Sequence, residues 1–265
     1  MPVLFACLGL AVGSFLNVCI YRMPRGKSVV SPRSACPGCG RFIAWRDNIP
    51  LLSYLLLGGR CRFCRAPISF RYPLIEAATA GLFLWSYFYV VPATVRELGF
   101  AVFSCYLAAS LLALSVIDVE FQLIPNRITY PLAVVGVGLT AFWVLALGFP
   151  LGKMLLRAAL GAVVGGGSLW LVGVLGKLAL RKEAMGMGDV KLMAAAGIWL
   201  GWEMVLFAIF LGALAGALVS LVLLLLGLTR MGKRLPFGPF LSIGIWICFL
   251  YGWDILFWYL GLYRG

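Results

Sequence analysis

Residues 204–228 read MVLFAIFLGALAGALVSLVLLLLGL, a run of 25 residues without a charged side chain or a proline. A helix of about 20 apolar residues is long enough to cross the hydrocarbon core of a bilayer. The run therefore predicts a transmembrane helix. Its glycines at 212 and 216 are small residues of the kind that let membrane helices pack closely.

The rest of the chain has the same apolar character. Its 265 residues are 63% hydrophobic and 12% charged, whereas a soluble domain has about 45–50% apolar and about 25% charged residues. Seven further apolar runs cover residues 2–21, 72–91, 98–118, 128–148, 154–176, 190–202 and 237–260. Together the runs predict an all-α polytopic membrane protein with about eight transmembrane helices. The run 190–202 is the weakest of them because it is short.

The Lys and Arg residues are distributed unevenly over the loops. The segment 22–71 contains ten of them and a single acid, Asp47. If this segment is cytoplasmic, three other loops are cytoplasmic as well, and with Lys191 that side holds 18 of the 22 Lys and Arg residues. These loops are 119–127, 177–189 and 229–236. Cytoplasmic loops of membrane proteins carry such an excess.

This charge distribution predicts the topology and the domain organisation. We expect both termini to lie outside the cytoplasm, and we expect 1–21 to be a retained first transmembrane helix. The run lacks the basic start and small-residue cleavage site of a signal peptide. We also expect a cytoplasmic loop domain at 22–71 and a seven-helix membrane core at 72–265.

The net charge of +13 does not predict a nucleic-acid partner. The basic residues sit in loops between apolar runs, where they determine topology, and no basic helix stands outside the membrane segments. We expect anionic lipid headgroups to be the main partner of the basic segment 22–71.

Four cysteines in 22–71 form the pattern CxxC…CxxC, with 21 residues between the two pairs. Each pair brings two thiolates to one metal ion, and we expect Gly38 to allow the tight turn in the first pair. Two such pairs complete the four-sulfur site that is typical of structural zinc. The alternative, two disulfides, conflicts with a cytoplasmic location. The predicted ligands are Cys36, Cys39, Cys61 and Cys64.

The sequence contains no histidine. This excludes Ser-His-Asp and Cys-His catalysis and histidine metal ligands. Acid–base chemistry must therefore use one of the nine acidic residues, a cysteine, a lysine or a tyrosine.

Asp118 and Asp189 are the acids that best fit a catalytic role. Asp118 ends one apolar run, and Asp189 opens another within Gly186-Met-Gly-Asp189. The topology puts both at the cytoplasmic ends of their helices. Two carboxyl groups within hydrogen-bonding reach share one proton, so one can activate a water while the other donates to a peptide carbonyl. The pair therefore predicts an aspartic protease.

Helix direction adds an expectation about the shared proton. Asp118 lies at a helix C-terminus and Asp189 at an N-terminus, so the helix dipoles favour the proton on Asp118. The alternative to catalysis is that each carboxylate caps or anchors a helix end, and Asp189 is well placed for an N-cap.

The chain resembles the type IV prepilin peptidases, also called prepilin leader peptidase/N-methyltransferases. Besides the two CxxC pairs and the two aspartates, the resemblance rests on ordered motifs along nearly the whole chain. They are residues 13–24 (GSFLNVCIYRMP), 48–53 (NIPLLS), 71–76 (RYPLIE), 123–126 (LIPN), 186–193 (GMGDVKLM) and 236–240 (PFGPF).

The resemblance implies an enzyme of the bacterial inner membrane with its active site facing the cytoplasm. It implies cleavage of the basic leader from type IV prepilins and pseudopilins after a glycine, with Asp118 and Asp189 as the catalytic pair. It further implies N-methylation of the new N-terminal residue with S-adenosyl-L-methionine, although no GxGxxG follows a predicted strand. The four cysteines match the family's zinc ligands.

Two other readings stay open. A peptidase-only member would cleave prepilins without methylating them. A membrane scaffold or transporter would use the aspartates for ion passage, but both lie at helix ends and not at mid-bilayer.

Overall fold

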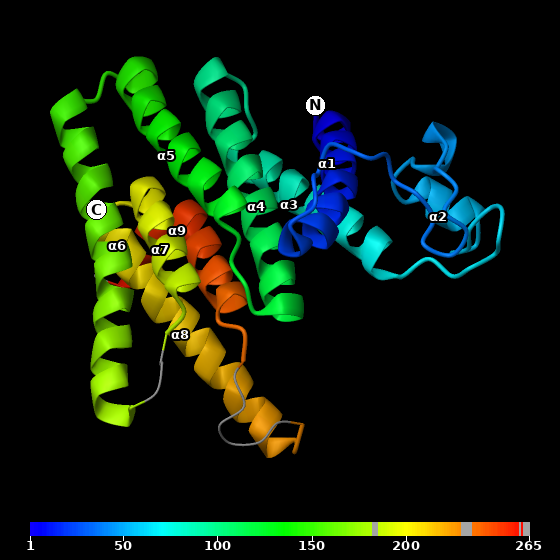
Figure 1. Ribbon diagram of the computed structural model, residues 1–265. Helices are drawn as coiled ribbons and strands as arrows, with labels where there is room; N and C mark the ends of the chain where they lie inside the picture. The colour runs from blue at the N-terminus through cyan, green and yellow to red at the C-terminus, as the bar shows by residue number, and fades with distance from the viewer. Residues whose placement is uncertain (182–184, 229–234, 260, 262–265) are drawn as a thin grey trace. The chain divides into compact units, whose positions relative to one another are not determined.

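The computed structural model describes residues 1–181, 185–228, 235–259 and 261 (Figure 1). Within these ranges the chain is helical, with two isolated β-bridges and no strand. Part of the loops 177–189 and 229–236 therefore lies outside the described residues. The elements in chain order are α1 (Pro2–Arg22), η1 (Met23–Arg25), η2 (Trp45–Asp47), α2 (Leu52–Leu56), α3 (Arg71–Val90), α4 (Val95–Phe121), α5 (Asn126–Leu147), α6 (Leu151–Leu180), α7 (Met187–Leu200), α8 (Trp202–Leu225) and α9 (Gly238–Tyr259).

Six helices of the described chain are long and apolar enough to cross a membrane, namely α1, α4, α5, α6, α8 and α9. The protein is therefore a multi-pass membrane protein, as predicted. The expected number of eight spans is not confirmed. The two remaining expected spans form helices α3 and α7, but α7 has 14 residues and a length of only about 21 Å.

Contacts divide the chain into two compact units, Met1–Ala113 and Leu114–Gly265. The predicted domains, 1–21, 22–71 and 72–265, were defined by which segments cross the membrane and not by contacts. They stay a prediction.

In the first unit, α1 and α3 pack against each other in antiparallel directions. A Cβ atom on Gly9 would lie 2.6 Å from the Cα of Ala80, and one on Gly13 would lie 2.7 Å from the Cα of Glu76. Only glycine permits this backbone approach. The segment between these two helices contains η1, η2, α2 and the cysteine pairs.

In the second unit, α7 contacts α5, α6, α8 and α9 (Figure 1). Gly161 of α6 and Gly197 of α7 touch so closely that a Cβ on either would overlap the backbone carbonyl of the other. Trp199 adds a buried hydrogen bond, since its Nε1 donates to the carbonyl of Leu132 on α5 at 2.8 Å. The short helix α7 is thereby held at the centre of this unit, and its N-terminus carries Asp189.

Candidate active site and cysteine cluster

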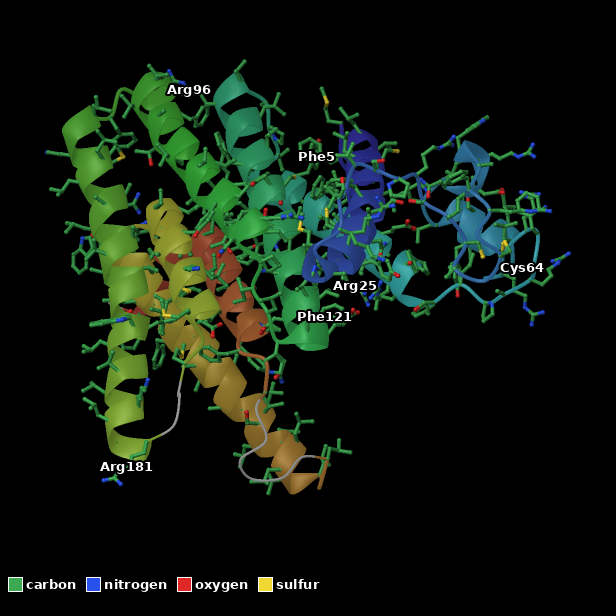
Figure 2. The ribbon with its side chains drawn as sticks, in the orientation of Figure 1. Phe5, Arg25, Cys64, Arg96, Phe121 and Arg181 are labelled. Atoms are coloured by element: carbon green, nitrogen blue, oxygen red, sulfur yellow. The ribbon has the colours of Figure 1, made fainter. Side chains whose placement is uncertain are left out.

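Asp118 lies in the last turn of α4. The helix ends three residues later at Phe121, which is labelled in Figure 2. The side chain of Asp118 is only 7% exposed. The backbone N–H of Gly238, the first residue of α9, donates a hydrogen bond to Asp118 Oδ2 at 2.8 Å. A Cβ on Gly238 would lie 2.8 Å from the same oxygen, so the contact requires glycine at this position.

Asp189 is the third residue of α7, and Gly186 is the N-cap. The backbone of Gly186 donates a hydrogen bond to the Asp189 carboxylate, the contact that an acidic residue makes in a capping box. Helix capping was the expected alternative to catalysis. Asp189 does contact the N-cap residue, but it does so from the third helical position and is not the cap itself.

The two carboxyl groups interact electrostatically. The pKa of Asp189 is raised to about 6, first by burial and then by the negative charge of Asp118, while the Gly186 hydrogen bond acts in the opposite direction. Asp118, which is 71 positions away in the sequence, therefore lies near Asp189 in the fold. The structure thus places the two predicted aspartates close enough for their charges to interact.

Burial acts on both carboxyl groups of the pair. The raised pKa of Asp189 is consistent with a protonated Asp189, whereas the helix dipoles favour the proton on Asp118. The expectation that Asp118 carries the shared proton therefore stays a prediction.

The loop between α4 and α5 packs directly on the start of α7. A Cβ on Gly188 would lie 2.9 Å from the Cβ of Ile124, which is itself buried. Lys191 Nζ donates to Asn126 Oδ1 at 3.2 Å. The motifs 123–126 and 186–193 therefore meet, and Gly188 is a glycine because Ile124 occupies the space of a side chain.

Sequence reasoning did not assign a role to Gly238, although its motif 236–240 was noted. The available signal was a glycine between prolines or aromatic residues at the start of the last apolar run. Of the other acidic residues near the site in sequence, Glu120 is exposed, and Glu183 lies outside the described residues.

The two cysteine pairs fold into turns of the same geometry. In the first, Cys36 N–H donates to the carbonyl of Arg41 and Gly40 N–H to the carbonyl of Cys36; in the second, Cys61 and Arg65 repeat the pattern. The residue four positions after the first cysteine has positive φ in both, 69° at Gly40 and 58° at Arg65. The positive φ of the turn therefore falls on Gly40 and not, as was expected, on Gly38, and Gly38 instead faces the Sγ of Cys64.

The four cysteines converge as predicted. Cys64 lies in this loop (Figure 2), and the Sγ atoms of Cys36, Cys39, Cys61 and Cys64 all lie within 4.8 Å of one another. All eight cysteines of the chain are free. A tetrahedral site with Zn–S distances of about 2.3 Å separates its sulfurs by about 3.8 Å, and Cys36 Sγ and Cys64 Sγ are 3.7 Å apart. The cluster could hold a metal ion of this kind.

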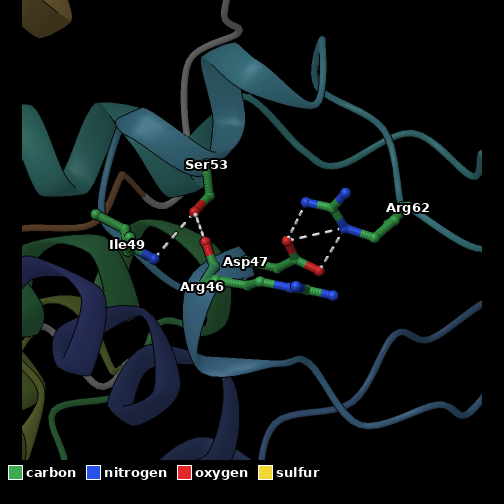
Figure 3. Close-up of polar contacts among 5 residues, drawn as sticks. All are labelled: Arg46, Asp47, Ile49, Ser53 and Arg62. Carbon is green, nitrogen blue, oxygen red and sulfur yellow. Dashed lines mark hydrogen bonds and ion pairs between the residues drawn. The ribbon is translucent and has the colours of Figure 1, made fainter.

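An ion pair ties the second cysteine turn to the segment before α2 (Figure 3). Arg62 lies within the CRFC motif and approaches both carboxylate oxygens of Asp47, with Nη2 2.6 Å from Oδ1 and Nε 2.9 Å from Oδ2. Ser53 holds the same segment through two hydrogen bonds, accepting from Ile49 N–H and donating to the carbonyl of Arg46. Arg62 also holds the pKa of Asp47 below its usual value.

A polytopic α-helical protein with a buried and a half-buried carboxyl group at two helix ends, close enough for their charges to interact, has the construction of a membrane aspartic protease. The four-cysteine loop after the first helix narrows this class further. The chain belongs to the Type IV leader peptidase family, whose model matches residues 105–221, and residues 7–90 match the Bacterial Peptidase A24 N-terminal domain.

Curated relatives extend the similarity over nearly the whole chain. A prepilin leader peptidase/N-methyltransferase of Pseudomonas aeruginosa is 40% identical, over 92% of this chain and 88% of its own length. Proteins of the same name from Aeromonas salmonicida and Pseudomonas putida are 38% and 41% identical, over 95% and 94% of this chain and 91% and 90% of their own lengths. No solved structure matches significantly.

Proposed function

We propose that the chain is an inner-membrane aspartic endopeptidase that removes the basic leader of prepilins and pseudopilins after glycine and then N-methylates the new N-terminal residue. The observation that carries the peptidase half is the electrostatic pairing of Asp118 with Asp189 at the ends of α4 and α7. Family membership supports both halves, since relatives of 38–41% identity carry both activities in their name.

In the proposed mechanism the two aspartates have different tasks. The ionised Asp118 takes a proton from a water molecule, and the resulting hydroxide attacks the scissile carbonyl carbon while the protonated Asp189 donates to the carbonyl oxygen. The C–N bond then breaks as the leaving nitrogen takes up the proton from Asp118 and a hydroxyl of the tetrahedral intermediate returns a proton to Asp189, which leaves a carboxyl group on the leader. The Gly238 N–H keeps the Asp118 carboxylate in place.

The proposed zinc ion is structural. Four cysteine ligands leave no open coordination position, so the ion would organise the loop between α1 and α3 and supply no chemistry to the aspartates. The loop is polar and has few buried side chains, so metal binding would supply the stability that a core supplies elsewhere. The methyl donor is S-adenosyl-L-methionine, as in the family that the chain resembles.

The active site faces the cytoplasm in this proposal. The basic loops, with 18 of the 22 Lys and Arg residues, support that orientation through the positive-inside rule. The same loops would contact anionic lipid headgroups, and no nucleic acid takes part.

The test is cleavage of a purified prepilin by the wild-type chain and by Asp118→Ala and Asp189→Ala, each in detergent or nanodiscs. We expect either substitution to abolish cleavage, because the pair needs both a base and an acid. Full activity of either variant would exclude the catalytic pair.

The peptidase-only alternative needs a separate measurement. Transfer of a labelled methyl group from S-adenosyl-L-methionine to a peptide that is already cleaved reports methylation without cleavage. A wild-type chain that cleaves prepilin and transfers no label is a peptidase only.

A further inference from the structure

Glu76 is a buried carboxylate that the peptidase mechanism does not use. It lies in the second turn of α3 and is 7% exposed. Its Oε2 accepts the backbone N–H of Leu51 at 2.8 Å, and the hydroxyl of Ser14 donates to the same carboxylate. Neither partner carries a positive charge. An ionised carboxylate buried without a cation costs several kcal/mol, so a positive group would stabilise the ionised form of Glu76.

Asn17 presents a second buried acceptor beside Glu76. Its side chain is 2% exposed, and its Nδ2 donates to the carbonyls of Gly13 on α1 and Tyr72 on α3, at 3.3 and 3.1 Å. Because carbonyls only accept, these two bonds determine which amide atom is the nitrogen. Asn17 Oδ1 is then buried without a hydrogen-bond partner.

The α1–α3 contact holds the two groups within one helical turn. Tyr72, whose carbonyl Asn17 binds, is four residues before Glu76 on α3. Gly13, whose carbonyl Asn17 also binds, touches the Cα of Glu76. The same site bears backbone strain: Leu51, which donates to Glu76, has φ 58° and ψ −50°, and strain of this kind in a non-glycine residue is typical of functional positions.

The chemistry of this pair selects its ligand. The pair offers a negative carboxylate and a neutral amide oxygen, both of them acceptors, so an anion is excluded. A water molecule would satisfy Asn17 Oδ1 but would supply no positive charge to an ionised Glu76. A primary ammonium group has three N–H donors and one positive charge, and it satisfies both groups at once.

We propose that Asn17 and Glu76 bind the free α-ammonium group of the cleaved substrate. This inference rests on the proposed function, in which peptide cleavage creates a new α-amino group and methyl transfer then acts on it. The site adds to that function the residues that recognise the amine, which neither the catalytic aspartates nor the cysteine cluster provides.

The experiment measures binding of two labelled peptides to the full chain in nanodiscs at pH 6.5, without methyl donor. Both peptides carry the first 20 or so residues of a mature pilin and a C-terminal fluorophore. One has a free N-terminal amine, and the other is Nα-acetylated. We expect the wild type to bind the free peptide at least tenfold more tightly. Glu76→Gln removes the charge and keeps an acceptor for Leu51, and we expect it to reduce this preference to less than twofold, with Asn17→Leu acting in the same direction.

Ser86→Ala is the matched control, since Ser86 is a fully buried hydroxyl on α3 that bonds to Leu82 and Ser104. It should keep the wild-type preference. Equal affinity of the wild type for both peptides, or an undiminished preference in Glu76→Gln and Asn17→Leu, would overturn the inference. Prepilin cleavage by the same samples separates the two proposals. Cleavage without amine preference refutes only the amine site, whereas absent cleavage in the wild type refutes the proposed function.

Discussion

Asp189 is a half-buried carboxyl group, and its ionised form lowers the stability of the folded state. Its pKa is raised from 3.8 to about 6, by burial first and by the Asp118 charge second. A raised pKa means that the folded state favours the protonated form. The stabilising contribution of Asp189 is therefore complete below about pH 3.8 and is lost as the pH rises through about 6. Strongly perturbed carboxyl groups of this kind are typical of active sites.

Asp189→Asn should raise the thermal stability of the protein at pH 8, because an amide never has to lose a proton inside the site. The gain should shrink as the pH falls through about 6 and vanish near pH 4, where the wild-type carboxyl is protonated as well. Thermal unfolding in detergent at pH 4, 6 and 8 measures this. Prepilin cleavage should be lost at every pH.

Asp47→Asn is the control of opposite sign. Arg62 lowers the pKa of Asp47, so the stability from this pair is present at neutral pH and is lost as the pH falls below the usual value of 3.8. Asp47→Asn should therefore destabilise slightly at pH 8, since an ion pair whose arginine is solvent-exposed contributes little.

An Asp189→Asn variant that unfolds at a lower temperature than the wild type at pH 8 would contradict the buried-carboxyl interpretation.

At the scale of elements, the site depends on the approach of α9 to the end of α4. Gly238→Ala keeps the N–H that Asp118 accepts, but its Cβ would lie 2.8 Å from Asp118 Oδ2. Real Cβ atoms do not come this close, so the carboxylate or the start of α9 must shift. We expect at least a tenfold loss of kcat for prepilin cleavage, because misplaced catalytic groups reduce rates strongly.

Gly138→Ala in α5 is the matched control for that substitution. A Cβ at Gly138 meets no atom within 4 Å, and alanine favours helix over glycine by about 1 kcal/mol. This variant should cleave normally and be at least as stable as the wild type. Equal activities of Gly238→Ala and Gly138→Ala would show that the contact with Asp118 has no role in catalysis.

The cysteine loop should depend on its metal. We expect about one zinc ion per chain, and we expect Cys61→Ser to lose it, because three thiolates bind more weakly than four. Metal analysis together with limited proteolysis between α1 and α3 should show a metal-free, readily cleaved loop. Cys7→Ser changes an exposed cysteine outside the cluster and should retain both metal and protection. Full zinc occupancy in Cys61→Ser would contradict the four-sulfur site.

Sequence reasoning reached the helices and the site residues through different signals. Apolar length predicted the membrane helices, and CxxC spacing predicted a cluster that the fold does assemble. It did not predict the Gly238 hydrogen bond, because a backbone donor has no side-chain signature. Nor did it predict the Asn17–Glu76 pair, because a single acid in an apolar run carries no information about its partner on another helix. Which aspartate holds the shared proton stays a prediction, because helix direction can be read from the sequence whereas burial cannot.

At the scale of the whole molecule, helix α3 decides which side of the membrane carries the aspartates. It is not one of the six apolar spans, yet its 20 residues extend about 30 Å, the thickness of the hydrocarbon core. Its contacts with α1 run antiparallel along most of that length. Phe5 meets Tyr87 with ring centroids 5.2 Å apart, and Asn17 binds Tyr72. If α1 crosses the membrane, α3 therefore crosses it in the opposite direction.

Reporter fusions test whether α3 crosses the membrane. With α3 and α4 both crossing, the segment 91–94 lies in the periplasm, and 122–125 lies in the cytoplasm with the basic loop 22–71. Alkaline phosphatase is active only outside the cytoplasm, so we expect activity from a fusion at 92 and none from a fusion at 123. If α3 does not cross, α4 runs the other way and both results reverse. Asp118 would then lie on the opposite side from the loop that follows α1. Because α5 and α6 form a pair of crossings between Asp118 and Asp189, both aspartates stay on one side in either case. The fusions thus decide whether the two aspartates lie on the cytoplasmic side, where the basic leader of a prepilin is located.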